Sequence, residues 1–299
     1  MTNSPKQLLG PMRVAFLVLP PVCVLLGIGT AALTDEPINA LHAVLIFIGA
    51  LAAHISVNSL NEYFDFKSGL DLRTMRTPFS GGSGTLPANP AMARSALNTG
   101  LITLAITSLI GLYFTFVRGW ALLPLGLLGL VVIVAYTPWL TRYWLPCLIA
   151  PGLGFGPLMV MGTDFALTGS YSWTAFIASL VPFFLVNDLL LLNQFPDVEA
   201  DRSAGRRHLL IVAGKKRSSV VYVAFLFFAF LSIAVGVGLG YLPVHGLLGL
   251  LPLVIAVPTA IGVIRYAEVM DKLMPYLGLN VLLQVITPLL LAIGLLIAG

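Results

Sequence analysis

Polar residues recur at helical spacing where one apolar segment of the chain ends. Intervals of four, three and four residues separate His54, Asn58, Asn61 and Asp65. On a helix, side chains at these intervals share one face. Gly69 can end that helix in a left-handed turn, so we expect Asp71 to fold back toward Asp65.

A second acidic motif closes another apolar segment and repeats part of the first. Asn193, Asp197 and Asp201 follow one another at intervals of four residues, which predicts a second polar helical face. The pattern Asn-x3-Asp thus occurs twice, 132 residues apart. This repetition suggests an internal duplication with two half-sites that face each other.

Two facing clusters of oxygen ligands favour the chemistry of Mg²⁺ and phosphate. Mg²⁺ takes one or two carboxylates together with substrate phosphate oxygens, and carboxylates near a membrane are costly unless they are paired or liganded. We therefore expect the motifs to hold Mg²⁺ ions that bridge a diphosphate. The alternative, solvated acidic residues paired with nearby bases, is disfavoured by the shared spacing. The bases that can neutralise phosphate charge are Lys67, Arg73, Arg76, Arg206 and Arg207.

The composition places both motifs in a membrane protein. The chain has 299 residues, 58% of them hydrophobic and 9% charged, with a mean hydropathy of +0.98. A soluble domain carries about a quarter charged residues, and long apolar runs in lipid form helices. We expect an all-α polytopic membrane protein with nine spans, near residues 11–34, 39–60, 94–117, 119–137, 143–163, 173–194, 218–241, 244–264 and 274–298.

The basic residues divide unequally between the two ends of these spans. Of the 16 Lys and Arg residues, only Arg118 falls at one end. The positive-inside rule then puts the N-terminus and both acidic motifs in the cytoplasm and the C-terminus on the opposite side of the cell membrane. No basic run resembles a nucleic-acid-binding patch. We expect one domain over residues 1–299, built from two four-helix half-repeats plus a ninth helix.

The paired motifs resemble those of the UbiA superfamily of intramembrane prenyltransferases. The two Asp-rich motifs of that family look like Asn61-Glu62-Tyr-Phe-Asp65-x5-Asp71 and Asn193-x3-Asp197-x3-Asp201-x3-Gly205-Arg206. The layout of the nine spans is also similar. Glu62 stands where the family more often has Asp, and Arg206 replaces a frequent Lys.

The resemblance implies a reaction, a cofactor and a site. It implies transfer of a prenyl group from an allylic polyprenyl diphosphate to an aromatic acceptor, with Mg²⁺ as cofactor. The implied metal ligands are Asp65, Asp71, Asp197 and Asp201. The implied substrate-binding residues are Asn61, Lys67, Arg76, Asn193, Arg206 and Arg207.

Other residues near the motifs are candidates for the reaction. Tyr136 is a candidate for stabilising the allylic cation with its ring or for contacting the diphosphate, although it also fits an interfacial aromatic belt. Asp71, or a water beside it, is a candidate for accepting the proton released by the acceptor. The glycine-rich segment from Arg76 to Pro87 is either a flexible connection or a set of backbone N–H groups for an anion. We expect it to cap the site.

The acceptor stays open between two branches of the family. The spacing from Asp65 to Asp71 and the segment Gly156-Pro157-Leu-Met-Val-Met-Gly162-Thr163 are similar to the branch that prenylates 1,4-dihydroxy-2-naphthoate in menaquinone biosynthesis. The segment Tyr136-Thr-Pro138-Trp-Leu-Thr-Arg142 is closer to the 4-hydroxybenzoate branch. We favour the naphthoate.

A secondary transporter is the main alternative of a different class. Transporters also have internal repeats and carboxylates within the membrane, but they place their key charges near its middle. Here the acidic residues cluster at helix ends beside basic loops. Two further polar residues lie inside spans: His54, which we expect to hydrogen-bond to a neighbour, and Asp188, which can pair with another helix, for example at His54.

Overall fold

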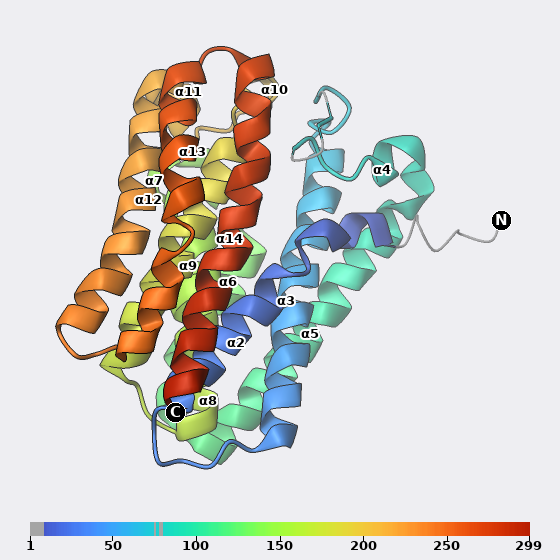
Figure 1. Ribbon diagram of the computed structural model, residues 1–299. Coiled ribbons are helices and arrows are strands. Elements are labelled where there is room, and N and C mark those ends of the chain that lie inside the picture. Colours follow the sequence, from blue (N-terminus) through green and yellow to red (C-terminus); the bar gives the residue numbers. More distant parts are fainter. Residues whose placement is uncertain (1–8, 75, 78–79) are drawn as a thin grey trace.

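The computed structural model describes residues 9–74, 76–77 and 80–299, and over this part of the chain it is helical without strands. The helices stand side by side as one elongated bundle (Figure 1). This confirms the predicted all-α class.

The described residues contain seven helical segments that are long and apolar enough to cross a membrane. They are α3 (Ala40–Lys67), the segment Pro90–Arg118 with η3 (Pro90–Met92) and α5 (Ala93–Arg118), Trp144–Thr168, α9 (Trp173–Asn193), α12 (Lys215–Gly238), the segment Val244–Tyr266 with η7 (Val244–Leu250) and α13 (Leu253–Tyr266), and α14 (Met270–Ala298). Two shorter apolar helices are α2 (Leu19–Ala31) and Trp120–Ala135, which joins η4 (Trp120–Leu122) to α6 (Leu123–Ala135). The number of nine spans stays a prediction.

The segment Trp144–Thr168 is not a uniform α-helix. It consists of α7 (Trp144–Leu153), the π-helical η6 (Gly154–Met161) and α8 (Gly162–Thr168). Pro151 and Pro157 lack the N–H that a regular helix needs, which explains the local change of hydrogen bonding. A Cβ on Gly152 or Gly156 would overlap a carbonyl oxygen of α9. Glycine therefore lets this segment lie against α9.

Two groups of helices form the bundle. In the first group, α3 packs along α5, and a small hydrophobic core joins α2, α3 and α8. In the second group, a larger hydrophobic core lies between α9, α12 and α14. The short helices α4 (Thr85–Ala88), α10 (Val198–Ser203) and α11 (Leu209–Ala213) lie at the same end of the bundle, opposite the C-terminus and α8 (Figure 1). The remaining short turns are η1 (Gly10–Met12), η2 (Val14–Phe16) and η5 (Leu140–Arg142).

The same turn follows each acidic motif. After α3, Gly69 adopts a positive φ of 77°, and the N–H of Leu70 donates to the carbonyl of Asp65 at 3.0 Å. After α10, Gly205 has φ 77°, and the N–H of Arg206 donates to the carbonyl of Asp201 at 3.0 Å. This left-handed turn favours glycine, because it carries no Cβ. The expected turn at Gly69 is confirmed, and it recurs at the second motif.

The second polar stripe is not continuous, contrary to the prediction from its spacing. Asn193 is the last residue of α9, and residues 194–197 form a turn before α10 begins at Val198. Pro196 explains the break, because proline lacks an N–H and disfavours helical backbone at the residue before it. The N–H of Asp201 still donates to the carbonyl of Asp197 at 2.9 Å, so these two residues remain one turn apart.

Candidate active site

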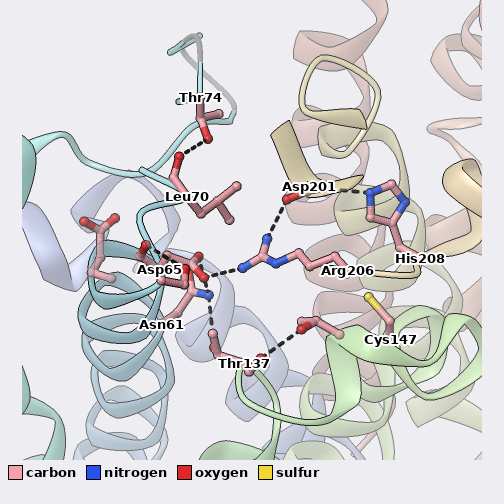
Figure 2. A network of polar contacts seen from close by, with 12 residues as sticks. Asn61, Asp65, Leu70, Thr74, Thr137, Cys147, Asp201, Arg206 and His208 are labelled. Atoms are coloured by element: carbon pink, nitrogen blue, oxygen red, sulfur yellow. Dashed lines mark hydrogen bonds and ion pairs between the residues drawn. The ribbon is translucent and has the colours of Figure 1, made fainter. Parts of the chain in front are cut away.

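The two acidic motifs meet at the guanidinium group of Arg206. Its Nη1 donates to Oδ1 of Asp201 at 2.9 Å, and its Nη2 is paired with Oδ1 of Asp65. Figure 2 shows the Arg206 side chain extending between the two carboxylates, one on each side of the site. The sequence predicted that the half-sites converge, and the structure brings them within the span of one side chain.

A hydrogen-bond network fixes Asp65 on the α3 side. The Nδ2 of Asn61 donates to Oδ2 of Asp65 and to the hydroxyl of Thr137, both at 3.0 Å, and Nη2 of Arg13 donates to Oδ1 of Asn61 at 3.2 Å. Together with Arg206, these contacts engage both oxygens of Asp65. The first motif is thus held in place by contacts with the protein's own side chains.

Asp201 is held in a similar way on the other side. Its Oδ1 accepts from Arg206, and its Oδ2 lies 3.0 Å from Nε2 of the buried His208 (Figure 2). Burial opposes the charge of Arg206, but the two adjacent carboxylates outweigh it and raise the pKa of the guanidinium above its ordinary value. Arg206 therefore remains a fixed positive charge at the centre of the site.

Free oxygen atoms are found on other residues of the motifs. Within the described part of the chain, Oδ2 of Asp71, Oδ1 of Asp197 and Oδ1 of Asn193 are buried without a hydrogen-bond partner. Buried polar atoms normally have partners, and carboxylate and amide oxygens are the ligands that Mg²⁺ prefers. These three residues therefore fit a cation better than Asp65 or Asp201, whose oxygens are engaged.

The two carboxyl groups of the motifs that keep a free oxygen also have raised pKa values. Burial, together with Asp65 and Glu62, raises the pKa of Asp71 to about 7. Burial, together with Asp201, raises the pKa of Asp197 to about 7. A nearby cation would favour the charged form of both groups.

No ready-made metal cluster exists among the residues that the structure describes: no group of three or more His, Cys, Asp or Glu side chains could hold an ion by itself. This agrees with the way Mg²⁺ is usually bound, with few protein ligands and with substrate phosphates completing the shell. The residues present fit a metal that binds together with a phosphorylated substrate.

The basic residues expected to bind substrate are not all in the site. Lys67 is exposed, with its Nζ 5.9 Å from the centre of the Tyr63 ring. Arg76 is exposed, and its guanidinium lies against Gly84. Arg207 is exposed, and its backbone N–H donates to the carbonyl of Thr141 at 3.0 Å. Among the predicted bases, and within the part of the chain that the structure describes, Arg206 pairs with the carboxylates of the acidic motifs.

A cavity of about 550 Å³ begins beside the motifs and extends into the bundle. Arg13, Asn61, Asn193 and Tyr136 line its polar end. Mainly apolar residues line the rest, among them Ile46, Phe114, Leu122, Phe155, Leu158 and Ala166. The arrangement suits a molecule with a charged head and a long apolar tail.

Two expectations for polar residues inside the spans were wrong. His54 lines the cavity and stacks edge-to-face on Phe155 with ring centroids 5.7 Å apart, but in the described chain neither ring nitrogen has a hydrogen-bond partner. Asp188 is fully buried, and its carboxylate has no partner among the described residues, so it does not pair with His54. It lies beside α14, where Asn280 donates to its backbone carbonyl at 3.4 Å.

Sequence reasoning missed several residues that build the site. Arg13 was counted only as a basic residue, while Thr137 and His208 were not singled out. Arg13 and Thr137 lie 48 and 76 residues from Asn61 along the chain, so only the fold brings them to the motifs. The one usable signal was the position of His208, two residues beyond Arg206.

The profile of the UbiA prenyltransferase family matches residues 18–275 of the chain. The chain belongs to the UbiA prenyltransferase family. The resemblance and the enzyme class inferred from the two motifs are thereby confirmed at the level of the family.

Curated UbiA relatives with different names match at similar identity. The chain is 27% identical over 205 residues to the 1,4-dihydroxy-2-naphthoate octaprenyltransferase of Bacillus subtilis (strain 168). The matched region covers 68% of this chain and 64% of that protein. It is 29% identical over 252 residues to the digeranylgeranylglyceryl phosphate synthase of Pyrococcus horikoshii. This matched region covers 81% of this chain and 82% of that protein. The chain thus spans slightly less than two thirds of the Bacillus relative.

Solved UbiA structures share the fold. A digeranylgeranylglyceryl phosphate synthase superposes with a TM-score of 0.65 at 16% identity, over 97% of this chain and 98% of that chain. A UbiA homologue from Archaeoglobus fulgidus, bound to DMAPP and Mg²⁺, superposes with a TM-score of 0.62 at 12% identity, over 98% of this chain and 100% of that chain. At these identities the likeness concerns the fold alone.

Proposed function

We propose that this chain transfers a prenyl group from an allylic prenyl diphosphate to an acceptor, with Mg²⁺ as cofactor. The observation that carries the proposal is the meeting of Asp65 and Asp201 at Arg206, beside a mainly apolar cavity that Asn61 and Asn193 of the same motifs line. A charged diphosphate at the motifs and a prenyl tail in the cavity would each find a matching environment. UbiA membership and the DMAPP-bound and Mg²⁺-bound homologue support the same substrate class.

The metal would be held by the residues with free oxygens. Asp71, Asp197 and Asn193 offer these oxygens at the site, while Asp65 and Asp201 complete the predicted ligand set. When bound, Mg²⁺ neutralises charge on the departing diphosphate. Arg206 contributes a further positive charge there, and the exposed Lys67, Arg76 and Arg207 are proposed to attract the substrate.

The chain's own residues can then promote the transfer. The allylic C–O bond breaks, and its electron pair leaves with the diphosphate. Tyr136 lines the polar end of the cavity, where its ring would stabilise the allylic cation. The apolar walls exclude water, which would otherwise capture that cation. A carbon of the acceptor forms the new bond, and its proton passes to Asp71 or to a water beside it.

We propose 1,4-dihydroxy-2-naphthoate as the acceptor, in menaquinone biosynthesis. The spacing from Asp65 to Asp71 and the name of the Bacillus relative support it. A geranylgeranylglyceryl phosphate is the second candidate, because the Pyrococcus relative matches at similar identity. The third, 4-hydroxybenzoate, follows from the segment around Tyr136.

We also propose the arrangement in the membrane. The apolar helices fit a multi-pass membrane protein. The basic residues around the motifs favour a cytoplasmic site, with the N-terminus on the same side and the C-terminus opposite. The two four-helix half-repeats and the ninth helix stay part of this proposal.

One assay tests the function. Purified protein in detergent or lipid is incubated with Mg²⁺ and labelled allylic diphosphates of several lengths. Dihydroxynaphthoate, hydroxybenzoate, homogentisate and geranylgeranylglyceryl phosphate are offered in turn, and products are identified by mass. We expect a prenylated naphthoate, loss of the product with EDTA, and recovery when Mg²⁺ is restored.

The outcomes separate the alternatives. A product with another acceptor would replace the naphthoate and keep the prenyl transfer. Absence of any prenylated product, with diphosphate unconsumed, would overturn the proposed function. Movement of a substrate across reconstituted vesicles without diphosphate release would instead support a transporter.

A further inference from the structure

Glu62 lies between the two main residues of the first motif but takes no part in the Arg206 network. It belongs to α3, and only 1% of the residue is exposed. Its carboxylate accepts two hydrogen bonds from Ser83, one from the backbone N–H at 2.6 Å and one from the hydroxyl at 2.9 Å. Nε of Arg13 lies 3.5 Å from the same carboxylate. Both oxygens of Glu62 are thus committed to holding Ser83.

Ser83 belongs to a short segment, Ser80–Gly84, which we call the strap. Gly82 in the strap has φ 71°, and a Cβ at this position would lie 3.0 Å from Oδ1 of Asp71 and 3.3 Å from Oε1 of Glu62. Glycine lets the backbone take this left-handed conformation and lie against two carboxylates. The strap therefore contacts the first motif directly.

The other end of the strap contacts the second motif. Ser80 and the backbone of Gly81 lie beside the carboxylate of Asp197, where they partly oppose the rise of its pKa. The hydroxyl of Ser80 also lies 2.8 Å from the hydroxyl of Thr77. One oxygen of Asp197 has no hydrogen-bond partner in the described chain. The strap thus links the two motifs independently of Arg206, with Glu62 at one end and Asp197 at the other.

The two ends of the strap differ in whether their polar groups can bind a ligand. Glu62 lies 3.5 Å from Nε of Arg13, and each of its two carboxylate oxygens accepts a hydrogen bond from Ser83. Ser80 and Gly81 lie beside Asp197 and carry hydrogen-bond donors. An anion that binds there together with a cation can accept hydrogen bonds from these donors. One end is therefore an anchor, and the other presents donors.

We propose that Glu62 is a positioning residue, which fixes the strap through Ser83 so that Ser80 and Gly81 face the diphosphate of the substrate at Asp197. This inference rests on the proposed function, because it takes the ligand at Asp197 to be an allylic diphosphate. It also explains the departure of Glu62 from the more frequent aspartate. The extra methylene gives the carboxylate the reach to accept both hydrogen bonds of Ser83.

The test compares four substitutions with a matched control. Glu62→Ala and Ser83→Ala remove the anchor from either side, Glu62→Asp shortens it, and Ser83→Thr keeps the hydroxyl. Glu199→Ala is the control, because Glu199 is an exposed glutamate on α10 that pairs only at 4.0 Å with Arg202. Steady-state kinetics give KM for the allylic diphosphate, KM for the acceptor and kcat. Hydrogen exchange reports the protection of the strap amides.

We expect the anchor variants to weaken diphosphate binding selectively. Loss of a charge-assisted hydrogen bond corresponds to about tenfold in binding, so Glu62→Ala, Glu62→Asp and Ser83→Ala should raise KM for the diphosphate by about tenfold. KM for the acceptor and kcat should stay within about twofold, and the Ser83 amide should exchange faster. Ser83→Thr and Glu199→Ala should behave like the parent protein.

Other results would overturn the inference. An unchanged KM for the diphosphate in both Glu62→Ala and Ser83→Ala, or a fall in kcat alone, would exclude a positioning role at the diphosphate. A parent protein without prenylated product would instead contradict the proposed function. In that case hydrogen exchange still decides whether Glu62 holds the strap, because unchanged exchange at Ser83 in Glu62→Ala would remove the anchor itself.

Discussion

At the scale of single residues, the site separates carboxylates that are already paired from carboxylates that are still free. Asp65 and Asp201 are bound by Arg206, Asn61 and His208, whereas Asp71 and Asp197 each keep an unpartnered oxygen. The first pair organises the site, and the second pair is available to a ligand. The sequence motifs predict the same role for all four aspartates, but in the structure two of them are paired and two keep a free oxygen.

Removal of a free carboxylate should abolish the reaction without unfolding the protein. Asp197→Ala is expected to lower kcat/KM for prenyl transfer by about a hundredfold or more, the loss typical for a group that stabilises transition-state charge. The measurement is product formation at saturating Mg²⁺. Glu199→Ala, two residues away and exposed, serves as the control. Retained activity in Asp197→Ala would remove this residue from the metal site.

Removal of Arg206 should instead destabilise the protein. Arg206→Gln leaves Asp65 and Asp201 without their shared partner, and breaking a buried ion pair costs about 3 kcal/mol. We expect a clearly lower melting temperature for Arg206→Gln in detergent. Arg202→Gln should melt like the parent, because its ion pair with Glu199 is exposed. Equal melting of the two variants would contradict the bridging role of Arg206.

The shifted pKa values predict how stability depends on pH. The folded pKa of Asp71 and Asp197 is about 7, above the ordinary value of 3.8. A raised pKa contributes stability that is complete below the ordinary value and is lost as pH rises through about 7. Metal-free protein should therefore melt at a lower temperature at about pH 8 than at about pH 6.

Two comparisons isolate this effect from other titrating groups. The double variant Asp71→Asn, Asp197→Asn should show a smaller change in melting temperature between these two pH values. Mg²⁺ with a diphosphate should raise the melting temperature of the parent more at about pH 8. An equal pH dependence of parent and double variant would show that these carboxyl groups do not cause it.

At the scale of elements, the turns after α3 and α10 determine where the motifs end. Both turns use a glycine with φ 77° four residues after an aspartate. Gly69→Ala should cost about 1 kcal/mol, because alanine resists this conformation. It should also lower activity, since Asp71 follows the turn. Melting and product formation measure the two effects.

A glycine in a helix provides the control for this substitution. Gly111 lies in α5, and a Cβ there meets nothing within 4 Å in the described structure. Gly111→Ala should leave the melting temperature unchanged or raise it, because alanine favours a helix. If Gly69→Ala were as stable and as active as Gly111→Ala, the turn would not position Asp71.

The sequence predicted the elements better than their ends. The length of the apolar segments predicted the helical class, and the spacing of Asn61 and Asp65 predicted a polar face on α3. Both predictions depend only on local helix geometry. The helical continuation from Asn193 to Asp201 was wrong, since Pro196 ends α9. The partner Thr137 could not be predicted, because its contact with Asn61 joins segments 76 residues apart that only the tertiary fold brings together. His208 lies seven residues after Asp201, so its position was a usable signal.

At the scale of the whole molecule, the cavity connects the acidic end of the bundle to its apolar interior. Its volume of about 550 Å³ limits the length of the tail that fits. Gly129 lines it, and a Cβ there would meet only Leu158, at 3.8 Å, within the described residues. There is therefore room for a larger side chain to enter the cavity.

Filling the cavity should change the preference for substrate length. Gly129→Phe is expected to lower kcat/KM for long prenyl diphosphates by about tenfold or more relative to short ones, because the ring occupies tail space. Competition between two labelled diphosphates measures the preference. Gly238→Phe, at the exposed end of α12, is the control. An unchanged preference in Gly129→Phe would place the tail elsewhere.

The bridge made by Arg206 has a further consequence for the order of binding. Its guanidinium is a tethered counter-ion, which is paired with both Asp65 and Asp201. A divalent ion that binds alone must compete with Arg206 for the carboxylates of Asp65 and Asp201. When an anion binds with the ion, the anion can pair with Arg206 in place of these carboxylates. Titration calorimetry should therefore find weak Mg²⁺ uptake in isolation and cooperative uptake in the presence of a diphosphate.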